Sequence, residues 1–178
     1  FRKAVDLINN FKEYFIRHGQ EVYENPSPGN KAGGITTLED KSLGCTQKGG
    51  TAEVRDVLSY CEPVTEKGLN LVQGPGNDLC AITALMAAGA QMVLFTTGRG
   101  TPVGAPIPTV KVSTNTPLSE KKRNWIDFNA GRMVEDKSKE ELAKELFEYV
   151  LAVASGKKVK AEEAGFHDMA IFKQGVTL

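Results

Sequence analysis

The sequence predicts an α/β protein with a Rossmann-like, three-layer arrangement, in which a mainly parallel sheet lies between helices. A short apolar strand at 68–73 is followed by a glycine-rich turn, an alanine-rich helix over 79–90 and a strongly apolar strand at 91–97. Such a βαβ unit implies parallel strands and a right-handed crossover. Further short strands are expected at 109–114 and 125–129.

The N-terminal part of the chain reads as helical. Apolar residues recur every three or four positions over 1–17, which predicts a helix with one buried face, and Gly19 is placed to end it. Turn-forming residues dominate 25–34. A capping pair then predicts a second helix that starts near Thr37 and stops by 49–50.

Three further elements complete the expected chain. Residues 51–60 are expected to form a short helix. Ser138, with Glu141 three residues later, is a strong start signal for a long helix that runs to Ala154. Residues 169–172 are expected to form a last strand.

Length and composition favour one globular domain over residues 1–178. Lys+Arg 22 balances Asp+Glu 22, so nothing predicts attraction to nucleic acid or to an anionic membrane. No apolar run reaches the roughly 20 residues that span a bilayer, and no signal peptide is visible.

Cys45, Cys61 and Cys80 lack CxxC spacing, which favours a reduced cytoplasmic setting. Because Phe1 opens directly into a helical pattern, we expect a fragment of a longer protein.

The glycine-rich stretch 25–50 carries an acidic and basic cluster in its middle. Glu39, Asp40 and Lys41 fall in the first turn of the expected helix, where acids commonly cap the helix and offset its dipole. The functional alternative makes a carboxylate a ligand for a hard divalent cation and the lysine a general base. Spacing alone favours the capping role.

Polar, glycine-assisted segments follow the expected strands, at the edge where open parallel sheets bind ligands. Asn77 and Asp78 could cap the following helix, or Asp78 could bind metal or substrate hydroxyls. Arg99 stands between two glycines after a buried strand, which suits a bidentate carboxylate clamp. Lys111 is expected on an edge or an outer face, with a place in an anionic pocket as the alternative, and Asn115 follows its strand.

Several long segments resemble one family. They are PSPGNKAGGITTLEDKSLGCTQKGG, QGPGND, MVLFTTGRGTPVGAPIPTVKVSTNT and WIDFNAG, and they resemble the C-terminal catalytic region of the altronate dehydratase and galactarate dehydratase family. The resemblance runs from about Asn25 to the C-terminus. WIDFNAG and the GVTL ending favour the altronate branch, and a sulfolactate sulfo-lyase subunit is a related alternative.

The resemblance implies a cytoplasmic hydro-lyase that acts on a small sugar acid, turning altronate into 2-keto-3-deoxygluconate and water. It also implies a divalent metal, Fe²⁺ or Mn²⁺, for which Mg²⁺ or Ca²⁺ can substitute in a crystal. Family members carry an N-terminal domain of the β-clip type, and we expect this domain to lie outside the present sequence. We therefore expect the N-terminal remainder of the same protein as a partner, a homodimer, and neither nucleic acid nor membrane. An inactive fragment and a non-catalytic assembly domain remain alternatives.

Site roles follow from the resemblance as a group. Glu39 and Asp78 become the metal-ligand candidates, and Lys41 the candidate base, with Glu39 and Arg99 beside it as catalytic candidates. Arg99 and Lys111 would bind the substrate carboxylate. The remaining substrate-binding candidates are Asn30, Lys48, Asn77, Thr97 and Asn115.

Overall fold

A computed structural model describes residues 1–21 and 25–175, and it confirms the α/β class with parallel sheets. The chain divides into two compact units, one made of residues 1–73 with the segment from Lys173 onward and the other of Gly74–Phe172. Each unit holds one sheet, and each is described by itself below. The expectation of one domain over 1–178 stays a prediction.

The first unit contains three helices and a two-stranded parallel sheet. They are α1 (Arg2–Arg17), α2 (Pro28–Ala32), α3 (Leu38–Lys48), β1 (Val54–Leu58) and β2 (Leu69–Val72). Gly19 follows α1 with φ of 62°, and the next amide, of Gln20, donates to Phe15 O at 3.0 Å, so the expected glycine end of this helix is confirmed. Thr37 Oγ1 accepts from the amide of Asp40 at 3.1 Å, which confirms the start of α3.

The helix expected over 51–60 is wrong, because this segment contains β1. Val54 pairs with Leu69, and Leu58 pairs with Val72, in parallel register. Leu58 is buried at 2% exposure. β-branched residues spaced three apart fit a helix face or a short strand equally well, and here pairing with β2 decides the conformation.

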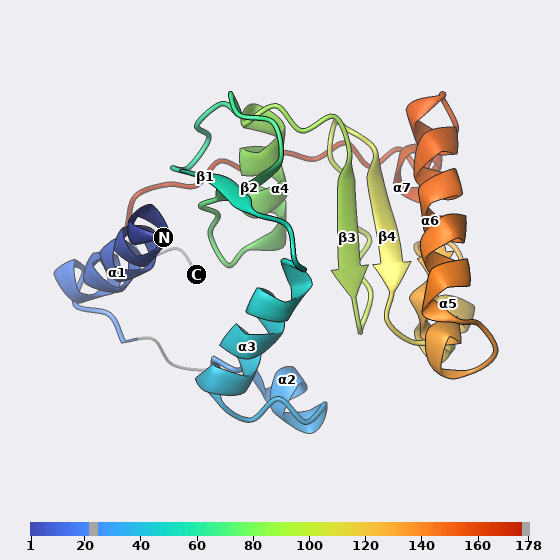
Figure 1. The fold of residues 1–178 in the computed structure, drawn as a ribbon, viewed down its shortest axis with the longest axis horizontal. Coiled ribbons are helices and arrows are strands. Elements are labelled where there is room, and N and C mark those ends of the chain that lie inside the picture. Colours follow the sequence, from blue (N-terminus) through green and yellow to red (C-terminus); the bar gives the residue numbers. More distant parts are fainter. Residues whose placement is uncertain (22–24, 176–178) are drawn as a thin grey trace. The chain divides into compact units, whose positions relative to one another are not determined.

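The second unit is built around three parallel strands in the order β3-β4-β5. Its elements are α4 (Asp78–Ala87), β3 (Val93–Thr97), β4 (Thr109–Ser113), α5 (Thr116–Lys121), β5 (Phe128–Asn129), the 3-10 helix η1 (Ala130–Val134), α6 (Lys139–Ala154) and α7 (Lys160–Glu163). Figure 1 shows β3 and β4 side by side and pointing the same way. The expected capping box at Ser138 is confirmed, with Glu141 Oε2 accepting from the Ser138 amide at 2.9 Å.

Helices cover both faces of this sheet. Val110 and Val112 of β4 pack with α6, α7 and their neighbours. Val93 of β3 lies on the opposite face, because it is in register with Thr109, and it packs with Ile82 of α4. The three-layer arrangement expected from the sequence is therefore present within this unit.

Two expectations about strands are wrong. β2 and β3 flank α4 in sequence, but β2 pairs with β1 while β3 pairs with β4, so the predicted βαβ neighbours lie in different sheets. Residues 169–172 form no strand. The amide of Ala170 donates a hydrogen bond to the side chain of Thr83, at 3.2 Å to Oγ1, and not to a neighbouring strand. Among the described residues, none of the helices is both long and apolar enough to span a bilayer.

Candidate functional site at the carboxyl edge of the second sheet

The turn that follows β3 is shaped by Thr97. Its Oγ1 accepts from the amide of Gly100 at 2.9 Å and from that of Arg99 at 3.4 Å. Gly100 has φ of 83°, and a Cβ there would meet Leu118 Cδ1 at 2.9 Å. Glycine is favoured at this position by its positive φ, and the turn lies against Leu118 of α5.

The turn after β4 is joined to this one. Asn115 Oδ1 caps α5 by accepting from the amide of Leu118 at 2.9 Å, and its Nδ2 donates to Gly98 O at 3.1 Å. The amide of Thr114 also donates to Thr97 O at 3.0 Å. The structure therefore brings together three of the predicted site residues: Thr97, Arg99 and Asn115.

Arg99 lies in the turn after β3, at this edge, with an exposed side chain. Its backbone is fixed on both sides, through Gly98 O and through the amides bound by Thr97 Oγ1. Across the ranges that the structure describes, no ion pair involves its guanidinium. A rigid backbone thus presents a planar cation whose donors are available to a ligand.

Lys111 occupies the middle of the central strand, so the expectation of an edge or outer-face lysine is wrong. The residue is 1% exposed, and its Nζ donates to Val103 O at 2.7 Å. Burial lowers the pKa of Lys111, and the nearby Asp127 carboxylate partly opposes that shift. Thr109 and Ser113 share its face of β4 and are equally buried. In this structure the ammonium binds a main-chain carbonyl, and its role in substrate binding stays a prediction.

Lys41 and Asn30 are brought together in the first unit. Lys41 Nζ donates to Asn25 Oδ1 at 2.7 Å and to Asn30 Oδ1 at 3.3 Å. Asn30 in turn closes a capping box with Ser27 at the start of α2. Two amide oxygens therefore hold a half-buried lysine amine at a fixed place.

The other four predicted residues lie at helix ends. Glu39 is in the first turn of α3 and Lys48 is its last residue, and both are exposed. Asn77 caps α4, with its Oδ1 accepting from the amide of Cys80 at 3.1 Å, and the exposed Asp78 begins that helix. The capping role is thus confirmed for Asn77, and the carboxylates are placed to offset helix dipoles.

The predicted metal ligands lack companions within their own units. Among the described residues, no group of three or more His, Cys, Asp or Glu side chains is arranged to hold a metal ion. Hard divalent cations need several oxygen ligands. Glu39 and Asp78 therefore lack, among the described residues, the further ligands that would hold such an ion with them.

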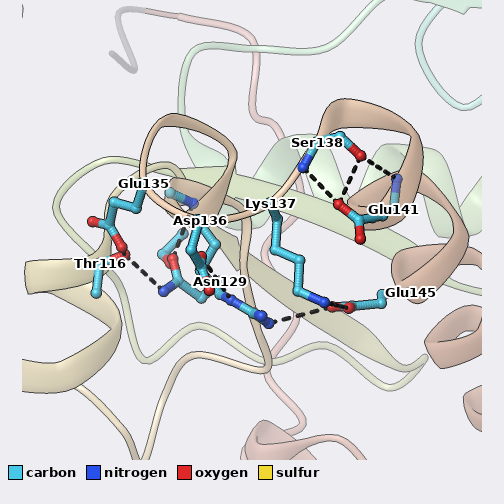
Figure 2. A network of polar contacts seen from close by, with 11 residues as sticks. Thr116, Asn129, Glu135, Asp136, Lys137, Ser138, Glu141 and Glu145 are labelled. Atoms are coloured by element: carbon cyan, nitrogen blue, oxygen red, sulfur yellow. Dashed lines mark hydrogen bonds and ion pairs between the residues drawn. The ribbon is translucent and has the colours of Figure 1, made fainter.

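The sequence reasoning missed Ser113, Asn129 and Thr116. Asn129 ends β5 and pairs in register with Ser113, whose Oγ donates to Asn129 Oδ1 at 3.3 Å. Asn129 Nδ2 donates to Thr116 Oγ1 at 2.9 Å, so the side chain reaches the start of α5 (Figure 2). The available signal was the asparagine that ends the WIDFN strand motif, next to the carboxyl edge.

The half-buried Asp127 carboxylate links several elements of this unit. Asp127 Oδ2 accepts from the amide of Lys111 at 2.8 Å, and its Oδ1 accepts from the amide of Lys160 at 2.9 Å and from Tyr149 Oη at 3.3 Å. Burial and the adjacent Asp127 carboxylate raise the pKa of Tyr149 well above its ordinary value. One carboxylate therefore ties β4 to α6 and to the start of α7.

Comparison with known proteins agrees with this arrangement of motifs. The family model described as "D-galactarate/Altronate dehydratase, C-terminal" matches residues 1–177. The chain is 63% identical over its whole length to an altronate dehydratase from Bacillus subtilis (strain 168) and 56% identical to one from Escherichia coli (strain K12). It spans 36% of the length of each of these two relatives.

A more distant relative is the galactarate dehydratase (L-threo-forming) of Escherichia coli (strain K12), which is 38% identical over 96% of this chain and 34% of its own length. The family match covers nearly every residue, including both units and all the predicted site positions. The chain belongs to the D-galactarate/altronate dehydratase family and corresponds to its C-terminal region.

Proposed function

We propose that this chain is the C-terminal catalytic region of a sugar-acid dehydratase that converts D-altronate into 2-keto-3-deoxy-D-gluconate and water. The observation that carries the proposal is the carboxyl edge of the second sheet, where two joined turns present the exposed Arg99 guanidinium. The family membership supplies the reaction class.

The edge offers groups that suit a hydroxylated carboxylic acid. Arg99 can donate two parallel hydrogen bonds to a carboxylate. Thr97 Oγ1 accepts from two amides, which leaves its own proton free to donate to a ligand. Asn115 uses its oxygen and one N–H within the protein, so its second N–H is left for a substrate hydroxyl.

Dehydration requires loss of the proton next to the carboxylate. A base removes that proton, the electron pair forms an enediolate on the carboxylate, and the β carbon–oxygen bond then breaks. The departing hydroxyl takes up a proton and leaves as water, and the resulting enol becomes the 2-keto acid. Arg99 stabilises the charge that develops on the enediolate. Lys41, held by Asn25 and Asn30, is the proposed base.

The divalent metal implied by the family resemblance is part of this proposal, with Fe²⁺ or Mn²⁺ as the expected ion. Its chemistry would be to stabilise the enediolate as a Lewis acid. We expect ligands beyond Glu39 and Asp78, in the N-terminal remainder of the longer protein. The homodimer and the cytoplasmic location expected from the sequence stay proposals as well.

Turnover by the full-length protein tests the reaction and its substrate. We expect formation of a 2-keto-3-deoxy acid from D-altronate, with slower or no turnover of galactarate and sulfolactate. A preference for galactarate or sulfolactate would support the lyase reaction but show that D-altronate is not the substrate. No turnover of any of the three acids, with Fe²⁺ or Mn²⁺ supplied anaerobically, would contradict the proposal.

Variants of Arg99 and Lys41 test the site. Replacing Arg99 with Lys removes the bidentate fork, and we expect kcat/KM to fall roughly 10- to 100-fold. Arg123→Ala, which changes another exposed arginine of the same unit, is the matched control and should leave turnover unchanged. Lys41→Ala should abolish turnover. Near-normal turnover in both Arg99→Ala and Lys41→Ala would favour the rival, a non-catalytic assembly domain.

A further inference from the structure

We propose that Asn129 is a positioning residue that aims Arg99 at the substrate carboxylate through Thr116 and Asn115. The inference deepens the proposed function and depends on it, because it assumes that Arg99 binds the carboxylate. It assigns a role to Asn129, which ends the strand of the WIDFNAG segment.

The Asn129 side chain links three segments at the end of β5. Its Oδ1 accepts from Ser113 Oγ at 3.3 Å and from the amide of Gly131 at 2.9 Å. Its Nδ2 donates to Thr116 Oγ1 at 2.9 Å. One side chain thus holds the end of β4, the start of η1 and the first residue of α5.

Thr116 connects Asn129 to Glu135 through its hydroxyl and to Asn115 through the backbone. Its hydroxyl accepts from Asn129 and donates to Glu135 Oε2 at 2.8 Å, as Figure 2 shows. It also follows Asn115 directly, and Asn115 Nδ2 donates to Gly98 O at 3.1 Å. A displacement of Thr116 would therefore move Asn115 and, with it, the turn that carries Arg99.

Close backbone packing reinforces the link. A Cβ built on Gly131 would lie 2.5 Å from Asn115 Cα and 2.5 Å from Thr116 N. Such short distances to backbone atoms cannot be relieved by rotating a side chain, so η1 presses directly on the turn before α5. The Asn129 hydrogen bonds and the Gly131 contact fix the same turn from one side.

Asn129 itself is half-buried, and most of its hydrogen-bonding capacity is used within the protein. A side chain committed in this way is poorly suited to contact substrate and well suited to hold other groups in place. Its removal should therefore weaken substrate binding through Arg99 and leave the chemical step less affected.

Asn129→Asp in the full-length protein tests this with a nearly isosteric change. The Thr116 hydroxyl has a single proton, which it donates to Glu135. In the variant, a carboxylate oxygen replaces the Asn129 amide nitrogen, so two acceptors would face each other and the hydrogen bond to Thr116 would be lost. We expect KM for D-altronate to rise about tenfold, with kcat changed less than KM. Asn124→Asp, at an exposed asparagine of the same unit, is the matched control and should leave both constants unchanged.

Thr116 supplies an independent pair of variants. Thr116→Val removes the hydroxyl and should reproduce the rise in KM, whereas Thr116→Ser keeps the hydroxyl and should behave like the parent protein. Equal loss of function in the serine and valine variants would overturn the proposal. So would failure of both Asn129→Asp and Thr116→Val to fold, because the pair would then be structural only.

A double-mutant cycle of Asn129→Asp with Arg99→Lys separates positioning from general destabilisation. If Asn129 acts through Arg99, the two effects on KM should combine to less than their product. If Arg99→Lys raises KM but the two effects multiply, this inference fails while the proposed function stands. If Arg99→Lys leaves kcat/KM unchanged, the proposed function fails with it.

Discussion

Gly131→Ala is the sharpest test of how the candidate site is held together. The added Cβ would lie 2.5 Å from Asn115 Cα and Thr116 N and 2.6 Å from Asn115 C, all of them backbone atoms. Real Cβ atoms do not approach so closely, so either η1 or the turn before α5 must shift. Overpacking of this kind costs about 1–3 kcal/mol.

The assay compares urea unfolding of Gly131→Ala with that of Gly76→Ala in the same unit. Neither glycine has positive φ, and nothing lies within 4 Å of the Cβ position at Gly76. The two variants thus add the same methyl group and differ in the space available. Equal unfolding free energies for both would refute the packing argument. A loss confined to Gly131→Ala, with a raised KM for the sugar acid, would support it.

Three further changes test other parts of the structure. Asp127→Asn removes one acceptor from a carboxylate that takes three hydrogen bonds, and urea unfolding should show a loss of about 1–3 kcal/mol, whereas Asp6→Asn, at an exposed site, should show none. Ser138→Ala breaks the capping box of α6 and should cost about 1 kcal/mol in the same assay, with Ser42→Ala as the neutral control; equal values for the two serine variants would contradict the role of the cap. Burial lowers the pKa of Lys111 only in the folded state. Between the lowered pKa and the ordinary lysine pKa the unfolded chain therefore binds more protons, so the free energy of unfolding should rise with pH over this window. The rise should disappear in Lys111→Met, and an unchanged pH dependence in that variant would contradict the assignment.

Local signals in the sequence were sufficient for most helix boundaries. Thr37, Asn77 and Ser138 were recognisable as caps because each has a side-chain oxygen placed to bind an amide in the first helical turn, and the structure shows all three bonds. Gly19 was recognisable as a helix end because glycine adopts positive φ without strain. These features depend on neighbours within a few residues, which a sequence displays directly.

Strand pairing could not be read in the same way. β1 was mistaken for a helix, and β2 was paired with β3, because both decisions depend on partners distant in the chain. The buried position of Lys111 was missed for a related reason. The alternation of residues along β4 shows which face Lys111 is on, but it does not show that β5 pairs with β4 and makes it the central strand. Residues 169–172 have an apolar pattern, but they pair with no strand in the described part of the chain.

The candidate site was predictable in part. Arg99, Thr97 and Asn115 were expected at the carboxyl edge, and they meet there because parallel strands end at the same side. Asn129 and Thr116 were not expected, because their role lies in contacts with each other and with Ser113. Lys41 and Asn30 were both candidates, but the hydrogen bond between them and the part played by Asn25 were not expected.

The most direct test of the central claim is a crystal structure of the full-length protein with D-altronate bound to an inactive Lys41→Ala variant. We expect the substrate carboxylate within hydrogen-bonding distance of both terminal nitrogens of Arg99, with its hydroxyls near Thr97 and Asn115. A substrate bound elsewhere, with Arg99 left in solvent and the β3 and β4 turns unoccupied, would contradict the account.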